Sequence, residues 1–76
     1  MFVKTQDNTL INMNSVAFIN VTKYLNMNKA TLKAYMDGMT LDVYTGSIEE
    51  AEDAFHTLEE GLIKKAQLIS YSEEDI

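Results

Sequence analysis

Residues 30–45, ATLKAYMDGMTLDVYT, decide the fold, because Asp37-Gly38 stands between two runs of alternating apolar and polar residues. Asp and Gly both tolerate positive φ angles, so the pattern predicts a β-hairpin with a two-residue type I′ turn. The turn fixes which residues lie opposite one another. The predicted inner pairs are Met36 with Met39, Ala34 with Leu41, Leu32 with Val43, and Ala30 with Thr45. These pairs are nearly all apolar, so we expect this face to be the core side.

The opposite face of the hairpin has a different chemistry. Its predicted pairs are Tyr35 with Thr40, Lys33 with Asp42, and Thr31 with Tyr44. Opposite charges and aromatic–threonine pairs stabilise antiparallel strands. A slip of one residue would turn Lys33 and Asp42 into the core, so we expect a firm register. This outer face is expected to meet water or a partner.

Three further strands are predicted before the hairpin. Residues 1–5, 9–13 and 16–22 are rich in apolar and β-branched residues, and polar segments separate them. With hairpin strands at 30–36 and 39–45, they predict an antiparallel meander of four to five strands.

A helix is predicted after the hairpin. Ser47 and Glu50 form a capping box, and Lys64 and Lys65 suit the far end of a helix. The apolar residues on one helical stripe are Ile48, Ala51, Phe55, Leu58, Leu62, Ala66 and Ile69. They predict an amphipathic helix over 48–69, about 22 residues and about 33 Å long. Its interior Gly61 is interpreted as tolerated at the flank of the stripe, the alternative being a close neighbour.

The predicted fold class is therefore α+β, an antiparallel sheet with one long C-terminal amphipathic helix packed on one face. Residues 1–69 are expected to be a single domain and 70–76 an acidic flexible tail. The helix should overhang the sheet, and its exposed end either frays or meets another chain.

Charge and composition limit the classes of partner. The chain of 76 residues has a net charge of −6 and no cysteine, so disulfides and thiolate metal sites are excluded. The acidic residues concentrate after residue 46, which argues against binding nucleic acid or an anionic membrane. The sequence shows no signal peptide and no long apolar run, so we expect a cytoplasmic protein that is not bound to a membrane.

His56 is the only histidine, and carboxylates lie within one turn of it at Glu52, Asp53, Glu59 and Glu60. This arrangement is a weak metal or small-ligand hypothesis, and an exposed histidine on a solvated acidic face is the favoured interpretation. No catalytic or phosphate-binding motif is present, so we expect neither an enzyme nor a cofactor.

Two surfaces are candidates for binding a protein partner. The acidic face of the helix carries Glu49, Glu52, Asp53, Glu59 and Glu60. The outer sheet face and the helix end carry Tyr35, Tyr44, Phe18, Ile63 and Leu68. Aromatic, weakly charged surfaces are typical of interfaces. Both sets of residues are also compatible with an ordinary solvated surface.

Three segments carry a resemblance to other proteins. They are the opening Met1-Phe2-Val3-Lys4-Thr5, the following Leu10-Ile11-Asn12 and the helix entry Ser47-Ile48-Glu49-Glu50-Ala51. The chain resembles small β-sheet-plus-helix proteins of low-GC Gram-positive bacteria and their phages. The resemblance covers most of the chain but carries over no site residue. It implies a fold. The first functional hypothesis is a non-catalytic protein-interaction module, a phage-type inhibitor or regulator of a host protein similar in kind to anti-CRISPR proteins, whose acidic surface occupies a basic or nucleic-acid-binding site. The alternative is a homodimer or larger homo-oligomer with a structural role.

Overall fold

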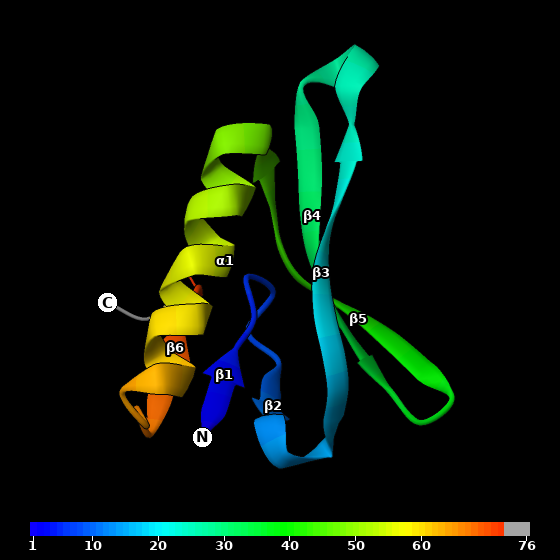
Figure 1. Ribbon diagram of the computed structural model, residues 1–76. Coiled ribbons are helices and arrows are strands. Elements are labelled where there is room, and N and C mark those ends of the chain that lie inside the picture. Colours follow the sequence, from blue (N-terminus) through cyan, green and yellow to red (C-terminus); the bar gives the residue numbers. More distant parts are fainter. Residues whose placement is uncertain (73–76) are drawn as a thin grey trace.

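The computed structural model describes residues 1–72, and these contain six strands and one α-helix (Figure 1). In chain order the elements are β1 (Phe2–Lys4), β2 (Leu10–Asn12), the 3-10 helix η1 (Met13–Ser15), β3 (Val16–Tyr24), the 3-10 helix η2 (Leu25–Met27), β4 (Lys29–Met36), β5 (Met39–Ser47), α1 (Ile48–Ile63) and β6 (Leu68–Ser70). The predicted α+β class, with a helix packed on β-strands, is confirmed.

The strands form two three-stranded sheets instead of the single meander expected. Their orders are β2-β1-β6 and β3-β4-β5. β1 runs antiparallel to β2 but parallel to β6, a strand that the sequence did not predict. Helix α1 packs on the face of β3-β4-β5, and β1 lies beside β6 (Figure 1). Val3 and Ile11 of the β2-β1-β6 sheet pack with Leu32, Val43 and Leu58 in one core.

The β4–β5 hairpin turns at Asp37-Gly38 as predicted, and Met36, Tyr35, Ala34 and Lys33 have the expected partners. Gly38 has a φ of 71°, whereas Asp37 is not among the residues with positive φ. The type I′ assignment is therefore wrong, since that turn needs positive φ at both positions.

A β-bulge changes the register in the second half of this hairpin. The pairing shifts between Leu32 and Lys33, so Leu32 lies opposite Tyr44 and Thr31 opposite Thr45. The extra residue in β5 is Val43, which is buried. The predicted pairs Leu32–Val43, Thr31–Tyr44 and Ala30–Thr45 are therefore wrong, because a bulge sets two residues against one.

The bulged edge of β5 is joined to the turn after β1. The Gln6 backbone N–H donates to the Val43 carbonyl at 2.8 Å. The Gln6 side chain accepts from the Thr45 N–H at 3.0 Å and donates to the Thr45 carbonyl at 3.1 Å. These bonds connect the two sheets and occupy backbone groups on the outer edge of β5.

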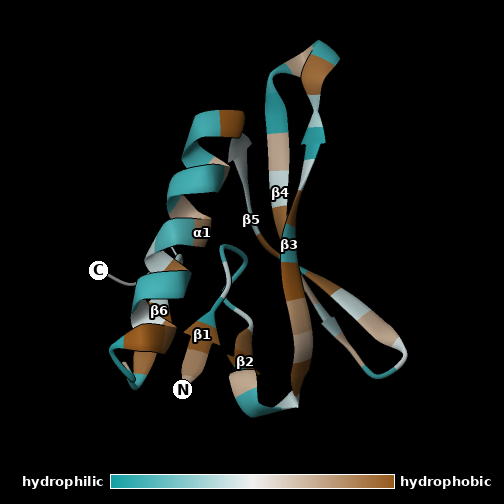
Figure 2. Cartoon of the chain, in the orientation of Figure 1, coloured by the Kyte–Doolittle hydropathy of each residue, from teal (hydrophilic) through white to brown (hydrophobic). Residues whose placement is uncertain are grey.

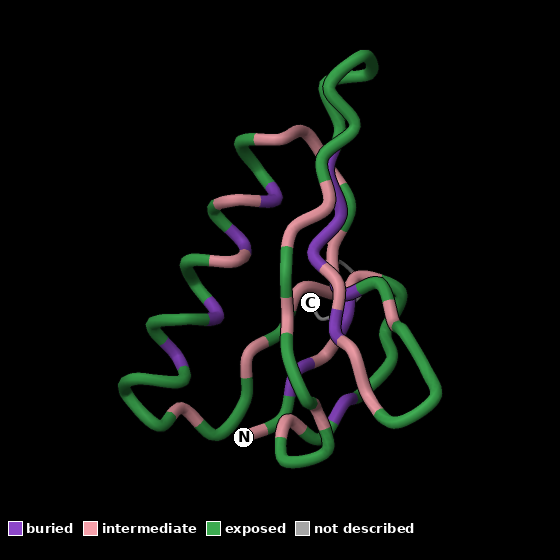
Figure 3. The backbone as a smooth tube through the Cα atoms, turned by 45° about the vertical axis from the view of Figure 1, so that its right-hand side comes forward, coloured by how far each residue is buried: buried purple, intermediate pink, exposed green. Residues whose placement is uncertain are grey.

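Helix α1 begins with the predicted capping box. The Glu50 N–H donates to the Ser47 hydroxyl at 3.1 Å, and the Ser47 N–H donates to the Glu50 carboxylate at 2.9 Å. The second bond, from the Ser47 backbone, holds the pKa of Glu50 below its usual value. Figure 3 shows the buried positions of α1 on the side that faces the strands.

The helix ends at Ile63 and not at residue 69. Lys65 takes a left-handed conformation with φ 57°, and the Ala66 N–H donates to the Gly61 carbonyl at 2.9 Å. The Lys65 N–H donates to the Leu62 carbonyl, and these two bonds make a Schellman motif, which stops a helix. The expected overhang therefore does not form, since the chain turns back as β6.

Strand β6 explains Gly61. A Cβ atom at this position would lie 2.1 Å from Cδ1 of Ile69, because β6 packs directly against the helix backbone there. The interpretation that Gly61 is merely tolerated is wrong, and the close-neighbour alternative is correct.

The segment after β6 is also packed. The hydroxyl of Tyr71 donates to the Ala54 carbonyl of α1, and burial raises the pKa of Tyr71 to about 12. A flexible tail starting at residue 70 is therefore wrong for Ser70 and Tyr71. The acidic residues Glu73, Glu74 and Asp75 lie outside the described residues.

Candidate interaction surfaces

The five predicted acidic residues lie on the water-facing side of α1, but they divide into two rows. Glu52 lines the groove between α1 and β3, and Glu59, seven residues later, lies on the same side of the helix. Glu49, Asp53 and Glu60 follow a second row that points away from the sheets. Every one of them except Glu52 is largely exposed. The acidic surface therefore has a side next to the sheet and a side in open solvent.

Three of these carboxylates have cationic or histidine partners. Glu52 lies 3.2 Å from the Lys23 ammonium of β3, and Glu60 lies 3.9 Å from Lys64. Glu59 lies 3.0 Å from Nδ1 of His56. Exposed pairs of this kind contribute only about 0–1 kcal/mol each, so they can be exchanged for contacts to another molecule.

His56 is exposed and its ring contacts Glu59 and lies 6.2 Å from the Phe55 ring centroid. Among residues 1–72 no group of three or more His, Asp or Glu side chains could hold a metal ion. This part of the chain therefore provides no set of ligands for the hypothesised metal or small-ligand site at His56.

The predicted aromatic surface is smaller than expected. Phe18 and Tyr35 stack on the outer face of β3-β4-β5 with ring centroids 4.4 Å apart and planes at 14°, and Phe18 is 57% exposed. Tyr44 does not join them. The bulge turns it toward the core, where its ring lies 5.9 Å from that of Tyr71. The placement of Tyr44 on the outer face is therefore wrong.

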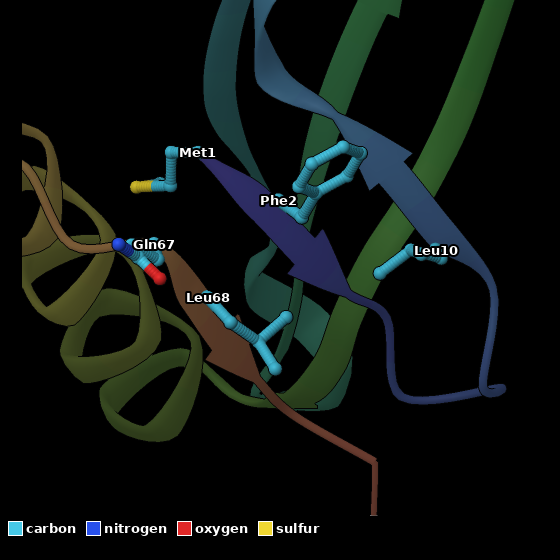
Figure 4. Close-up of a pocket in the computed structure, with 5 residues that line it drawn as sticks. All are labelled: Met1, Phe2, Leu10, Gln67 and Leu68. Atoms are coloured by element: carbon cyan, nitrogen blue, oxygen red, sulfur yellow. The ribbon is translucent and has the colours of Figure 1, made fainter.

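The two predicted residues near the helix end go to different places. Ile63 closes α1 and is 80% exposed. Leu68 belongs to β6 and lies beside Phe2 of β1, with Leu10 of β2 on the same face (Figure 4). Together with Met1 and Gln67 these residues line a shallow groove of about 460 Å³. The sequence did not predict Phe2 and Leu10 as surface residues. Their strands are apolar at neighbouring positions, so no alternation of apolar and polar residues indicates which side faces solvent.

A third apolar surface lies at the tip of the β3–β4 hairpin. Leu25 is 76% and Met27 65% exposed, and Tyr24 stands next to them. Figures 2 and 3 show this tip as an exposed, partly hydrophobic projection away from α1. The available signal was two apolar residues alternating with the turn formers Asn26 and Asn28.

No family model, no curated protein and no solved structure matches the chain. None of the helices within residues 1–72 has both the length and the apolar character that a membrane crossing needs.

Proposed function

We propose that this protein is a non-catalytic protein-interaction module that binds a basic protein partner through α1. The observation that carries the proposal is the set of carboxylates that α1 exposes on a well-anchored helix. The helix is capped at Ser47 and fixed from beneath by buried Ala51, Ala54 and Leu58. A preorganised row of like charges attracts an oppositely charged surface and speeds its association.

The class of partner follows from the charge. A groove that holds nucleic-acid phosphates is lined with lysine and arginine, and spaced carboxylates can occupy the same groups. We therefore propose a basic, nucleic-acid-binding host protein as the partner, in the cytoplasm. The resemblance to small phage proteins supports the role of an inhibitor or regulator encoded by a phage or mobile element, in the manner of anti-CRISPR proteins.

The test uses two variants of equal charge. The first removes the α1 acids by E49Q, E52Q, D53N, E59Q and E60Q. The control removes five acids outside α1, by D37N, D42N, E73Q, E74Q and D75N. Each protein is immobilised and exposed to a cell extract of a low-GC Gram-positive host, and captured proteins are quantified. We expect a basic nucleic-acid-binding protein on the wild type and the control, and at least tenfold less on the first variant.

Two results would contradict the proposal. Equal loss of capture by both variants would mean that net charge alone attracts the partner. Undiminished capture by the first variant would show that α1 is not the binding surface. Circular dichroism spectra of both variants must match the wild type, so that a loss of capture reports on the binding surface and not on folding.

A second candidate, self-association, is supported by one specific observation. Phe2, Leu10 and Leu68 expose apolar side chains on neighbouring strands around one groove. Contiguous apolar patches of this kind mark interfaces. We expect light scattering at two protein concentrations to give a rising mass for the wild type, and a constant monomer mass for L68E. The control I63E makes the same kind of change at a more exposed apolar residue outside the patch and should still associate. A monomeric wild type at both concentrations would rule this candidate out.

A further inference from the structure

Strand β3 is an open edge. It is nine residues long and stands at the end of the order β3-β4-β5. Within residues 1–72 its backbone pairs only with β4. The opposite edge of the same sheet is protected, because Gln6 occupies backbone groups of β5. Proteins usually block exposed edges with proline, charges or a covering segment. The chain has no proline, and β3 carries one charge, Lys23.

A groove accompanies this edge on the α1 side. It has a volume of about 350 Å³ and runs between β3 and the flank of α1. Ile19, Val21 and Lys23 contribute its floor, and Glu52, Phe55 and His56 its wall. In Figure 1 the front strand β3 runs beside α1. An open strand edge next to a helix-walled groove is the geometry that lets an extended peptide add to a sheet as a further strand.

We propose that an extended, basic segment of the protein partner adds to β3 as a fourth strand of this sheet. The segment lies in the groove beside Glu52 and reaches Glu59, which is two helical turns further along the same side of α1. The inference rests on the proposed function and specifies how the partner binds. Backbone hydrogen bonds to β3 provide the attachment. The side chains that face α1 provide the selectivity, with an apolar one against Phe55 and cationic ones at the two carboxylates.

The spacing of the groove supports a particular pattern. Glu52 and Glu59 are separated by two helical turns, roughly 10 Å along the axis. In an extended strand, side chains four positions apart face the same side and are separated by roughly 13 Å. The two spacings differ by roughly 3 Å, which the long, flexible side chain of lysine can span. Two cationic residues at that spacing, with an apolar residue midway, can therefore reach the two carboxylates and the Phe55 ring between them.

Charge decides against a second copy of this chain as the occupant. Antiparallel pairing of β3 with β3 of another copy would place both α1 helices on the same side of one continuous sheet. Glu52 of each copy would then line one shared groove from opposite walls, with Glu59 two turns further along each helix. Like charges brought together in this way oppose association, whereas a lysine- or arginine-bearing segment relieves them.

The experiment uses a defined peptide and the intact protein. The probe is the acetylated and amidated heptapeptide Thr-Lys-Thr-Val-Thr-Lys-Thr, which sets lysine, valine and lysine on one side. Binding is followed by NMR chemical shifts and by amide hydrogen exchange. We expect alternate amides of β3 between residues 17 and 23 to gain protection, because only every second residue points its backbone groups to the open edge.

Matched variants test the role of the wall. E52Q/E59Q should weaken binding of the peptide about threefold to tenfold, since it removes two exposed charge pairs. D53N/E60Q makes the same charge change on the solvent row of the same helix and should alter binding less than twofold. Replacing both lysines of the peptide by glutamate should weaken its binding to the wild-type protein by at least the factor expected for E52Q/E59Q.

The outcomes separate this inference from the proposed function. Peptide binding without alternate protection of β3 would overturn strand addition, while capture of a host protein through α1 would stand. The absence of any shift at millimolar peptide would also overturn it, whatever the capture experiment gives. Protection of β3 that grows with protein concentration without peptide would identify a second copy as the occupant and overturn the basic partner segment. Equal effects of the two variants would overturn the role of Glu52 and Glu59.

Discussion

Replacing Leu58 by Ala should lower the free energy of unfolding by about 3–5 kcal/mol, the largest effect expected of any single substitution here. Leu58 is fully buried where α1 meets both sheets. Its neighbours in the core include Leu32 and Val43 of the β3-β4-β5 sheet and Val3 of the β2-β1-β6 sheet. Because these strands are tied into two hydrogen-bonded sheets, they cannot close around the missing methyl groups, and a cavity remains.

The measurement is urea denaturation followed by far-ultraviolet circular dichroism. A domain of this length has a stability of roughly 4–11 kcal/mol, so L58A should shift the midpoint to low denaturant or leave a fraction unfolded. L62A is the matched control on the same helix, because Leu62 is exposed, and it should cost less than about 1 kcal/mol. Equal costs for L58A and L62A would contradict the packing of α1 described above.

Replacing Gly61 by Leu should lower the free energy of unfolding by about 2–3 kcal/mol, although leucine is the better helix former. The space that any side chain needs at this position is taken by Ile69 of β6, whose Cδ1 would lie 2.1 Å from the new Cβ. Ala66 lies on another side, 3.7 Å from the same point. The helix and β6 must therefore separate, and the pairing of β6 with β1 weakens.

The double variant G61L/I69A separates this clash from other causes. I69A vacates the space, so the cost of G61L in its presence should be smaller by about 1–3 kcal/mol, measured as a double-mutant cycle. Amide exchange in Leu68–Ser70 should increase in G61L and recover in the double variant. Additive costs would mean that Gly61 and Ile69 do not share this contact.

The features predicted correctly from the sequence are those that neighbouring residues specify. Asp37-Gly38 places a turn whatever lies around it, and Ser47 with Glu50 satisfies the backbone of a helix start within four residues. Such signals need no knowledge of the rest of the chain. The class of fold follows from them, because a hairpin and an amphipathic helix must bury their apolar sides against each other.

The features predicted wrongly depend on contacts between distant segments. Ala66 and Ile69 continue the apolar stripe of α1 in the sequence, and the helix nevertheless stops, with Lys65 in a conformation that usually requires glycine. Pairing of β6 with β1 favours the end of the helix at this point, and no residue near position 65 indicates it in the sequence. The bulge at Val43 is similar, since Gln6, far away in the sequence, binds the bulged strand.

The candidate surfaces were predictable in composition but not in arrangement. Exposure of the acidic residues follows from their side of the helix. Their division into two rows depends on where β3 passes, and the open edge of β3 is visible only once the order of strands is known. The hairpin tip at Leu25 and Met27 was overlooked for a different reason, because apolar residues in a turn are usually expected to fold inward.

The position of β1 between β2 and β6 also sets an order of events during protein synthesis. The ribosome makes β1 and β2 first, and β6 only after every other element described here. Until then the hairpin of β1 and β2 has one unpaired side. Closing a contact across so much chain is slow, and such unpaired edges attract chaperones or other nascent chains. The nascent protein is thus most vulnerable to misassembly at its N-terminal strands, throughout the time that the ribosome needs to reach residue 70.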